Sequence, residues 1–224
     1  MRRAISGAVV YVAAFAFLLF VPGHSLHSLR AWTLLALLAA LRLGGAVALH
    51  RANPGLMAER RKLIHPGQPA ADRILLTVWM AGFAALIAVA AADGTGAKRW
   101  GAPMPILAAI GLAAFICGWL LVFQVLIVNA YAVTVVRHQA DRGQRVVDRG
   151  PYRLIRHPMY AGMSAVVIGM CLWLGSWLAV AASVVPLGAL LGRIGLEEPL
   201  LRRALPEYNE YASRVRYRLI PGVW

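Results

Sequence analysis

The chain has 224 residues, of which 60% are hydrophobic and only 14% are charged. A soluble domain usually carries about a quarter charged residues, so the composition excludes an ordinary soluble protein. The net charge of +14 would suit a nucleic-acid-binding protein, but the basic residues lie in the segments between long apolar runs. We therefore expect a membrane protein with no nucleic-acid partner.

Six apolar runs are candidates for helices that cross a bilayer, which needs about 20 mostly apolar residues. They cover residues 4–21, 31–49, 74–92, 103–128, 159–174 and 176–192. Backbone groups in lipid must be satisfied within a segment, so these runs predict helices. The sequence thus predicts an all-α integral membrane protein with about five to six transmembrane helices. The last two runs are short, and they form either two full spans or a hairpin broken at Gly175-Ser176.

Lysine and arginine alternate between rich and poor segments along the chain. The N-terminus, residues 50–73, residues 137–157 and the tail hold nineteen, whereas residues 22–30, 93–102 and the 175–176 turn hold three. This pattern predicts that both termini and the active site are cytoplasmic, in an inner, plasma or endomembrane. Arg42 lies inside a span, where charge is costly. Either it faces a polar cavity or the span is displaced by a turn.

No repeat or linker divides the chain, so we expect one membrane domain over residues 1–224. Residues 1–136 are N-terminal transmembrane helices, and residues 137–224 form a cofactor-binding and catalytic region. In the tail, apolar residues recur at helical spacing from Leu196 to Val215, with charged residues between them. This spacing predicts a C-terminal amphipathic helix at the membrane interface, split at Pro206.

A polar segment, residues 146–162, runs directly into the fifth apolar run. Pro158 suits the first turn of a helix, which places Arg156 and His157 at the N-terminal end. The backbone N–H groups there favour an anionic group, and arginine offers a planar fork for a carboxylate or phosphate. A basic loop that binds lipid headgroups is the alternative interpretation.

Two adjacent acids, Glu197 and Glu198, follow the sixth run. Adjacent carboxylates beside a membrane are costly in free energy unless they are solvated, paired with a cation or part of a functional site. Successive side chains on a helix point about 100° apart, so the two acids should face different partners. A purely structural pairing with Arg193 or Arg202 is the alternative.

Residues 94–99 are faintly similar to a phosphate-binding loop, but no strand precedes them, so we expect no nucleotide site there.

Three ordered motifs resemble the C-terminal signature of the isoprenylcysteine carboxyl methyltransferases. They are Gly150-Pro151-Tyr152 with Arg156-His157-Pro158-Met159-Tyr160-Ala161-Gly162, then Glu197-Glu198, then Glu207-Tyr208, Tyr211 and Arg214-Val215. They are also similar to a wider group of small membrane methyltransferases that includes the phospholipid methyltransferases. The resemblance covers about residues 146–221. It departs at Leu205-Pro206, where many relatives have Phe-Gly, and at Arg216, where a proline is usual. The resemblance implies that both positions lie in the part that shapes the substrate entrance.

The resemblance implies transfer of a methyl group from S-adenosylmethionine, without a metal, to a lipophilic acceptor reached from the bilayer. The acceptor could be a prenyl-cysteine carboxylate, a phospholipid amine or another lipid; membrane lipids are further partners. The cofactor-binding residues implied by the resemblance are Arg156, His157, Tyr160, Gly162, Glu197 and Glu198. Arg214 and Glu198 are implied in catalysis, with Arg214 orienting a carboxylate or phosphate of the acceptor. The alternative functions are an enzyme similar to the membrane sterol reductases, which use NADPH, and a small transporter or scaffold.

Overall fold

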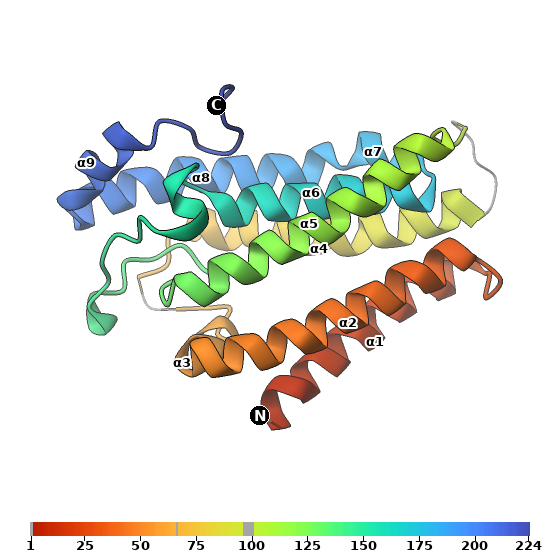
Figure 1. Cartoon of the computed structure of the whole chain (residues 1–224), viewed down its shortest axis with the longest axis horizontal. Coiled ribbons are helices and arrows are strands. Elements are labelled where there is room, and N and C mark those ends of the chain that lie inside the picture. The colour runs from red at the N-terminus through yellow and green to blue at the C-terminus, as the bar shows by residue number, and fades with distance from the viewer. Residues whose placement is uncertain (1, 66, 96–100) are drawn as a thin grey trace.

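The computed structural model describes residues 2–65, 67–95 and 101–224, and within these ranges the chain forms helices and short 3-10 turns without a strand (Figure 1). The helices are α1 (Arg2–Gly23), α2 (Leu29–Ala52), α3 (Pro54–Arg60), α4 (Ala70–Thr95), α5 (Pro105–Val128), α6 (Pro158–Leu174), α7 (Trp177–Ala182), α8 (Val184–Ala204) and α9 (Glu207–Arg214). The 3-10 turns are η1 (Ala140–Arg142) and η2 (Gly150–Arg153).

Five segments of the described chain are long and apolar enough to cross a membrane. They are Ile5–Gly23, Leu29–Ala52, Ala70–Gly94, Pro105–Val128 and Trp177–Ala204. Helix α6 is apolar as well but shorter, at 17 residues. The predicted all-α membrane fold with five to six spanning helices is confirmed.

The break at Gly175-Ser176 is present as a tight turn between α6 and α7. Gly175 ends α6 with φ 85°, a left-handed conformation that glycine adopts without strain. Ser176 then caps α7, because its hydroxyl accepts a hydrogen bond from the backbone N–H of Ala179 at 3.0 Å. The two runs therefore form a helical hairpin.

The last spanning helix extends further than the apolar run predicted. The run ends at residue 192, but α8 continues to Ala204. The acidic pair Glu197-Glu198 therefore lies within this helix and not after it, which corrects the predicted boundary. Hydropathy falls where charged residues begin, whereas glutamate, leucine and arginine are all good helix formers and prolong the helix.

Helices α5 and α6 approach each other closely at two glycine pairs, Gly111 with Gly169 and Gly118 with Gly162. A Cβ atom on Gly118 would lie 2.6 Å from the carbonyl oxygen of Gly162, and one on Gly162 would lie 2.8 Å from that of Gly118. Small residues at such contacts allow transmembrane backbones to pack directly. This contact fixes the position of α6, whose N-terminal end carries Arg156 and His157.

The polar segments gather at one end of the bundle. Helix α3, the turn η1 and helix α9 lie together at the left of Figure 1, and both chain ends lie toward that side. The short α1–α2 and α6–α7 turns lie at the opposite end. The arginine-rich segments thus share one end, in agreement with the alternation in the sequence. Residues 96–100, with Lys98, Arg99 and most of the loop-like stretch 94–99, lie outside the described residues.

The amphipathic tail is split as predicted, since α8 ends before Leu205 and α9 begins after Pro206. On α9, Tyr208 and Tyr211 are buried and pack with Leu205 and the partly buried Val146. The apolar face of this helix is therefore covered by the protein itself. Its position at a membrane interface stays a prediction.

Candidate functional site

The site is built around the first turn of α6. Pro158 is the first residue of this helix and His157 is its N-cap, as the sequence predicted. The backbone N–H groups of Arg156 and His157 donate to the carbonyls of Tyr217 and Arg218, each at 2.9 Å. The returning C-terminal segment thus satisfies the two donors and binds the start of α6 to residues 217–218.

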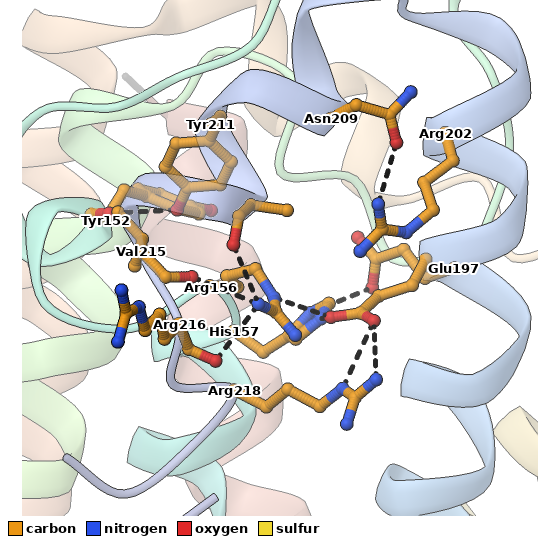
Figure 2. A network of polar contacts seen from close by, with 12 residues as sticks. Tyr152, Arg156, His157, Glu197, Arg202, Asn209, Tyr211, Val215, Arg216 and Arg218 are labelled. Carbon is orange, nitrogen blue, oxygen red and sulfur yellow. Dashed lines mark hydrogen bonds and ion pairs between the residues drawn. The ribbon is translucent and has the colours of Figure 1, made fainter. Parts of the chain in front are cut away.

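Arg156 is only 8% exposed, and its guanidinium group forms hydrogen bonds within the protein (Figure 2). Its Nε donates to Oε1 of Glu198 at 2.7 Å. Its Nη1 donates to the carbonyls of Val215 at 3.0 Å and Arg216 at 3.1 Å. Arg156 therefore joins α6, α8 and the segment after α9.

Glu198 is buried and surrounded by cationic or hydrogen-bonding groups. Besides Arg156, it contacts Nε2 of His157 at 3.2 Å through Oε1. Its other oxygen accepts from Nε and Nη2 of Arg218 at 3.1 and 3.0 Å. Hydrogen bonds between ionised groups are the strong ones, so this network holds the three chain segments in one arrangement.

Glu197 has different surroundings, because its side chain keeps 30% exposure and lines the main cavity. Its Oε2 accepts from the hydroxyl of Tyr160 at 2.8 Å and lies 3.7 Å from Nδ1 of His157. The adjacent carboxylates therefore face different partners, as helix geometry requires. Arg193 and Arg202, the alternative partners considered for these acids, contact other groups.

Arg193 forms a buried pair that the sequence did not reveal. Its Nε donates to Oδ1 of Asp72 at 2.8 Å, and Asp72 is fully buried. Oδ2 of Asp72 also accepts from Gln68 at 2.8 Å and from the backbone N–H of Val136 at 2.9 Å. Arg193 and Asp72 are 121 positions apart in the chain, so no local sequence pattern predicts the pair. Arg202 donates to Asn209 at 2.7 Å.

A cavity of about 440 Å³ connects the acidic site to the N-terminal helices. His157, Tyr160 and Glu197 line it on the side of α6 and α8. Tyr11, Arg42 and Trp119 line it on the side of α1, α2 and α5. Most of the wall is apolar, which is typical of small-molecule pockets. Arg42 lines this cavity, and the predicted span 31–49 lies within α2, so the residue is inside the span and faces a cavity whose wall is mostly apolar.

Three residues of the predicted site, Glu198, Gly162 and Arg214, lie away from the cavity wall. Gly162 faces Gly118 at the contact between α5 and α6. Arg214 is at the surface, where its side chain is 59% exposed and lies 3.4 Å from the equally accessible carboxylate of Asp148. Helix α9 turns Tyr208 and Tyr211 inward, and Arg214 follows on its outer face.

The tyrosines of α9 are neutral donors. Burial raises the pKa of Tyr208 and of Tyr211 above the ordinary phenol value. The hydroxyl of Tyr211 donates to the carbonyl of Tyr152 at 2.9 Å. The hydroxyl of Tyr208 has no partner, and Tyr208 lines the cavity.

In the described chain, no group of three His, Cys, Asp or Glu residues has an arrangement that could hold a metal ion.

Comparison with known proteins identifies one family. The model of the family described as phospholipid methyltransferase matches residues 106–207, from the start of α5 to the start of α9. The match includes Arg156, His157 and both glutamates, whereas Arg214 lies just beyond it. No curated protein matches the chain. The resemblance to the small membrane methyltransferases is confirmed by this match.

Proposed function

We propose that this chain, which carries a phospholipid methyltransferase family domain over residues 106–207, transfers a methyl group from S-adenosylmethionine to a lipophilic acceptor. The observation that carries the proposal is the partly exposed carboxylate of Glu197, which faces a largely apolar cavity lined by several membrane helices. A polar cofactor and an apolar acceptor need such a cavity, with one polar side and one apolar wall.

The residues at the polar side fit the chemistry of this cofactor. Its ammonium and ribose hydroxyl groups are donors, and Glu197 is an acceptor that faces the cavity beside Tyr160. Its carboxylate and adenine nitrogens are acceptors, and the unpartnered hydroxyl of Tyr208 is a donor in the same wall. We assign Glu197, Tyr160, His157 and Tyr208 to cofactor contact.

We assign Arg156 and Glu198 to the positioning of His157, because both already form hydrogen bonds within the protein. Glu198 holds the ring of His157 at 3.2 Å, and Arg156 holds Glu198 at 2.7 Å. Through these bonds they set the position of His157 beside Glu197. Gly162 contributes by letting α6 pack directly on α5.

Methyl transfer depends on alignment and on the exclusion of water. When bound, S-adenosylmethionine would supply an activated methyl group, which the acceptor attacks in line while the sulfur leaves as part of S-adenosylhomocysteine. The protein's part is to hold the two reactants in that geometry and to keep solvent from the reacting atoms. The apolar wall, with Met163, Val166 and Val167 on α6, serves the second purpose. The alternation of basic segments supports a cytoplasmic site, on the side where the cofactor is made.

Calorimetry with S-adenosylhomocysteine tests the proposal in detergent-purified protein. We expect wild type to bind, and Glu197→Gln to weaken binding by about 1–3 kcal/mol because a charged acceptor is lost. Glu207→Gln, an exposed acid on α9, is the matched control and should bind as wild type does. Absence of binding by wild type, or equal binding by Glu197→Gln, would contradict the proposal.

A further inference from the structure

The cavity wall holds a group of unpartnered buried donors, of which the proposed reaction uses only the hydroxyl of Tyr208. Buried polar atoms in proteins nearly always have a partner, so each exception calls for an explanation. Among the described residues, the unpartnered buried atoms that belong to cavity-lining side chains are Nε of Arg42, Nε1 of Trp79, Nε1 of Trp119, Nε of Arg137 and the hydroxyl of Tyr208. The four nitrogens carry N–H groups that can only donate. The cavity is therefore suited to a ligand rich in acceptors.

Two of these donors lie together on the side of α1, α2 and α5. The guanidinium carbon of Arg42 is 4.2 Å from the ring centroid of Tyr11 and 5.2 Å from that of Trp119. Trp119 is 8% exposed, and its Nε1 has no partner. Arg42 and Trp119 thus place two neighbouring unpartnered donors in the wall of the same cavity.

The charge of Arg42 is not balanced by an acid within the described residues. The arginines that pair with carboxylates there are Arg137, Arg156, Arg193, Arg214 and Arg218. The rings of Tyr11 and Trp119 attract the cation, but a ring face leaves the Nε hydrogen without an acceptor. A charge inside a membrane span is costly and usually marks a functional site.

A second arginine reinforces the positive charge. Arg60 donates to the carbonyl of Ala132 at 2.5 Å and contacts the sulfur of Met159 at 3.9 Å, without a carboxylate. Burial, followed by the charges of Arg42 and Arg193, lowers the pKa of Arg60 to about 10. The three guanidinium groups therefore act on one another, and of the three only Arg193 has an acid partner in the described chain.

The walls around Arg42 leave apolar contact surface for a hydrocarbon chain. Ala8, Ala46, Leu49, Val122 and Phe123 line the cavity there. Arg42 is ten residues from the end of α2, or about 15 Å along a helix axis. An anionic group bound there would lie below the level of the helix ends, with apolar side chains around its tail.

We propose that Arg42 and Trp119 bind the anionic head, a carboxylate or a phosphate, of an amphiphile with an acyl chain. The assignment rests on the proposed function, because it names anionic lipids as the acceptor class of the same cavity. Arg42 binds the charge, the indole N–H of Trp119 donates a second hydrogen bond, and Arg60 adds positive potential.

Quenching of tryptophan fluorescence tests this site directly, without turnover. The probes are dibrominated stearic acid, its neutral methyl ester and dibrominated phosphatidic acid, added to the detergent-solubilised protein. Bromine quenches a tryptophan only at short range, and Trp119 stands next to Arg42. We expect an anionic probe to quench at concentrations at least roughly ten-fold below those of the ester, the ratio that follows from losing a charged hydrogen-bond partner. Trp119→Phe should lack the quenched component.

Arg42→Met should remove the preference for the acid over the ester, because it keeps an apolar chain but loses the charge. Arg51→Met, at an exposed position on the same helix, is the matched control and should keep the preference. Quenching by stearic acid alone would identify a single-chain ligand, and quenching by phosphatidic acid would identify a phospholipid.

Equal quenching by acid and ester in wild type would overturn the assignment. If Arg42→Met kept the wild-type preference for the acid over the ester, the assignment would be overturned as well. Calorimetry with S-adenosylhomocysteine on the same preparations separates the two proposals. Cofactor binding without selective quenching would refute the anion site alone, and selective quenching without cofactor binding would refute the methyltransferase proposal alone.

Discussion

Glu198 lies at the centre of the polar network, with Arg156, His157 and Arg218 around its two oxygens. Glu198→Ala removes the buried anion and leaves Arg156 without its carboxylate, so we expect a destabilisation of about 3–5 kcal/mol, the range for breaking a buried pair from one side. Thermal unfolding in detergent, followed by far-ultraviolet circular dichroism, measures the change.

Asp148→Asn is the control for this substitution, because it breaks an ion pair of which both side chains are more than half exposed. Exposed pairs contribute little to stability, so its unfolding transition should stay close to that of wild type. A similar midpoint for Glu198→Ala and Asp148→Asn would show that the network around Glu198 does not stabilise the fold.

Arg214 is the residue whose predicted role has the least support from its position, since it lies at the surface near Asp148. If it orients the acceptor, Arg214→Ala should lower kcat/KM for methyl transfer and leave the affinity for S-adenosylhomocysteine unchanged. A loss confined to kcat would indicate a contact made in the transition state. Arg214→Lys should rescue little if a planar, two-pronged contact is needed. Turnover by Arg214→Ala at the wild-type rate would exclude the role.

At the level of helices, the contact between α5 and α6 depends on the absence of side chains at four glycines. A Cβ atom on Gly169 would lie 2.6 Å from the backbone nitrogen of Phe115, and backbone cannot move aside as a side chain can. We expect Gly169→Ala to destabilise the protein by about 1–3 kcal/mol, the usual penalty for overpacking. Unfolding curves recorded in detergent measure this change in the free energy of unfolding.

Gly188→Ala, on α8, is the matched control, because nothing lies within 4 Å of the added methyl group. Alanine is the better helix former by about 1 kcal/mol, so this variant should be as stable as wild type or slightly more stable. A loss in Gly188→Ala as large as that in Gly169→Ala would show that close packing is not the cause.

The helices themselves were largely predictable, because apolar runs, glycine and proline determine the extent and the ends of a helix through the local sequence. The run 103–128 nearly coincides with α5, and Gly175-Ser176 and Pro206 mark real breaks. Helix α3 was not expected, because it carries charged residues, which hydropathy treats as loop. A helix from Leu196 was expected as part of the tail, and α8 runs into it from the last apolar run without a break. The glycine pairs escaped notice because only the partner helix shows which glycines are in contact.

For the whole molecule, the sequence predicted which residues belong to the polar site better than it predicted their contact partners. The polar segment and the acid pair were found, and they do meet at one site. The return of residues 215–218 to Arg156 and His157 was not predicted, nor was the pair Asp72–Arg193. These contacts join segments far apart in the chain, and no local pattern encodes them. The cavity is likewise a property of six or more segments together.

The arrangement of basic segments at one end of the bundle leads to a prediction about topology. Both termini should lie in the cytoplasm, because retention of Lys- and Arg-rich segments on that side sets the orientation of the spans. Reporter fusions at residue 1 and at residue 224 measure the side directly. A signal from the opposite compartment at either position would contradict an even number of crossings with the site in the cytoplasm.

Arg42 also bears on how the chain enters the membrane during synthesis. One arginine at the centre of a span adds about 2.5–3.5 kcal/mol to the free energy of insertion by the translocon. The span of α2 has a mean hydropathy of 1.8, below the 2.2 of the span in α1. Because α1 precedes α2 in the chain, we expect Tyr11 to enter the bilayer before Arg42, and its ring, 4.2 Å from the guanidinium in the folded protein, to offset part of the penalty. The first two helices therefore insert most readily as a pair.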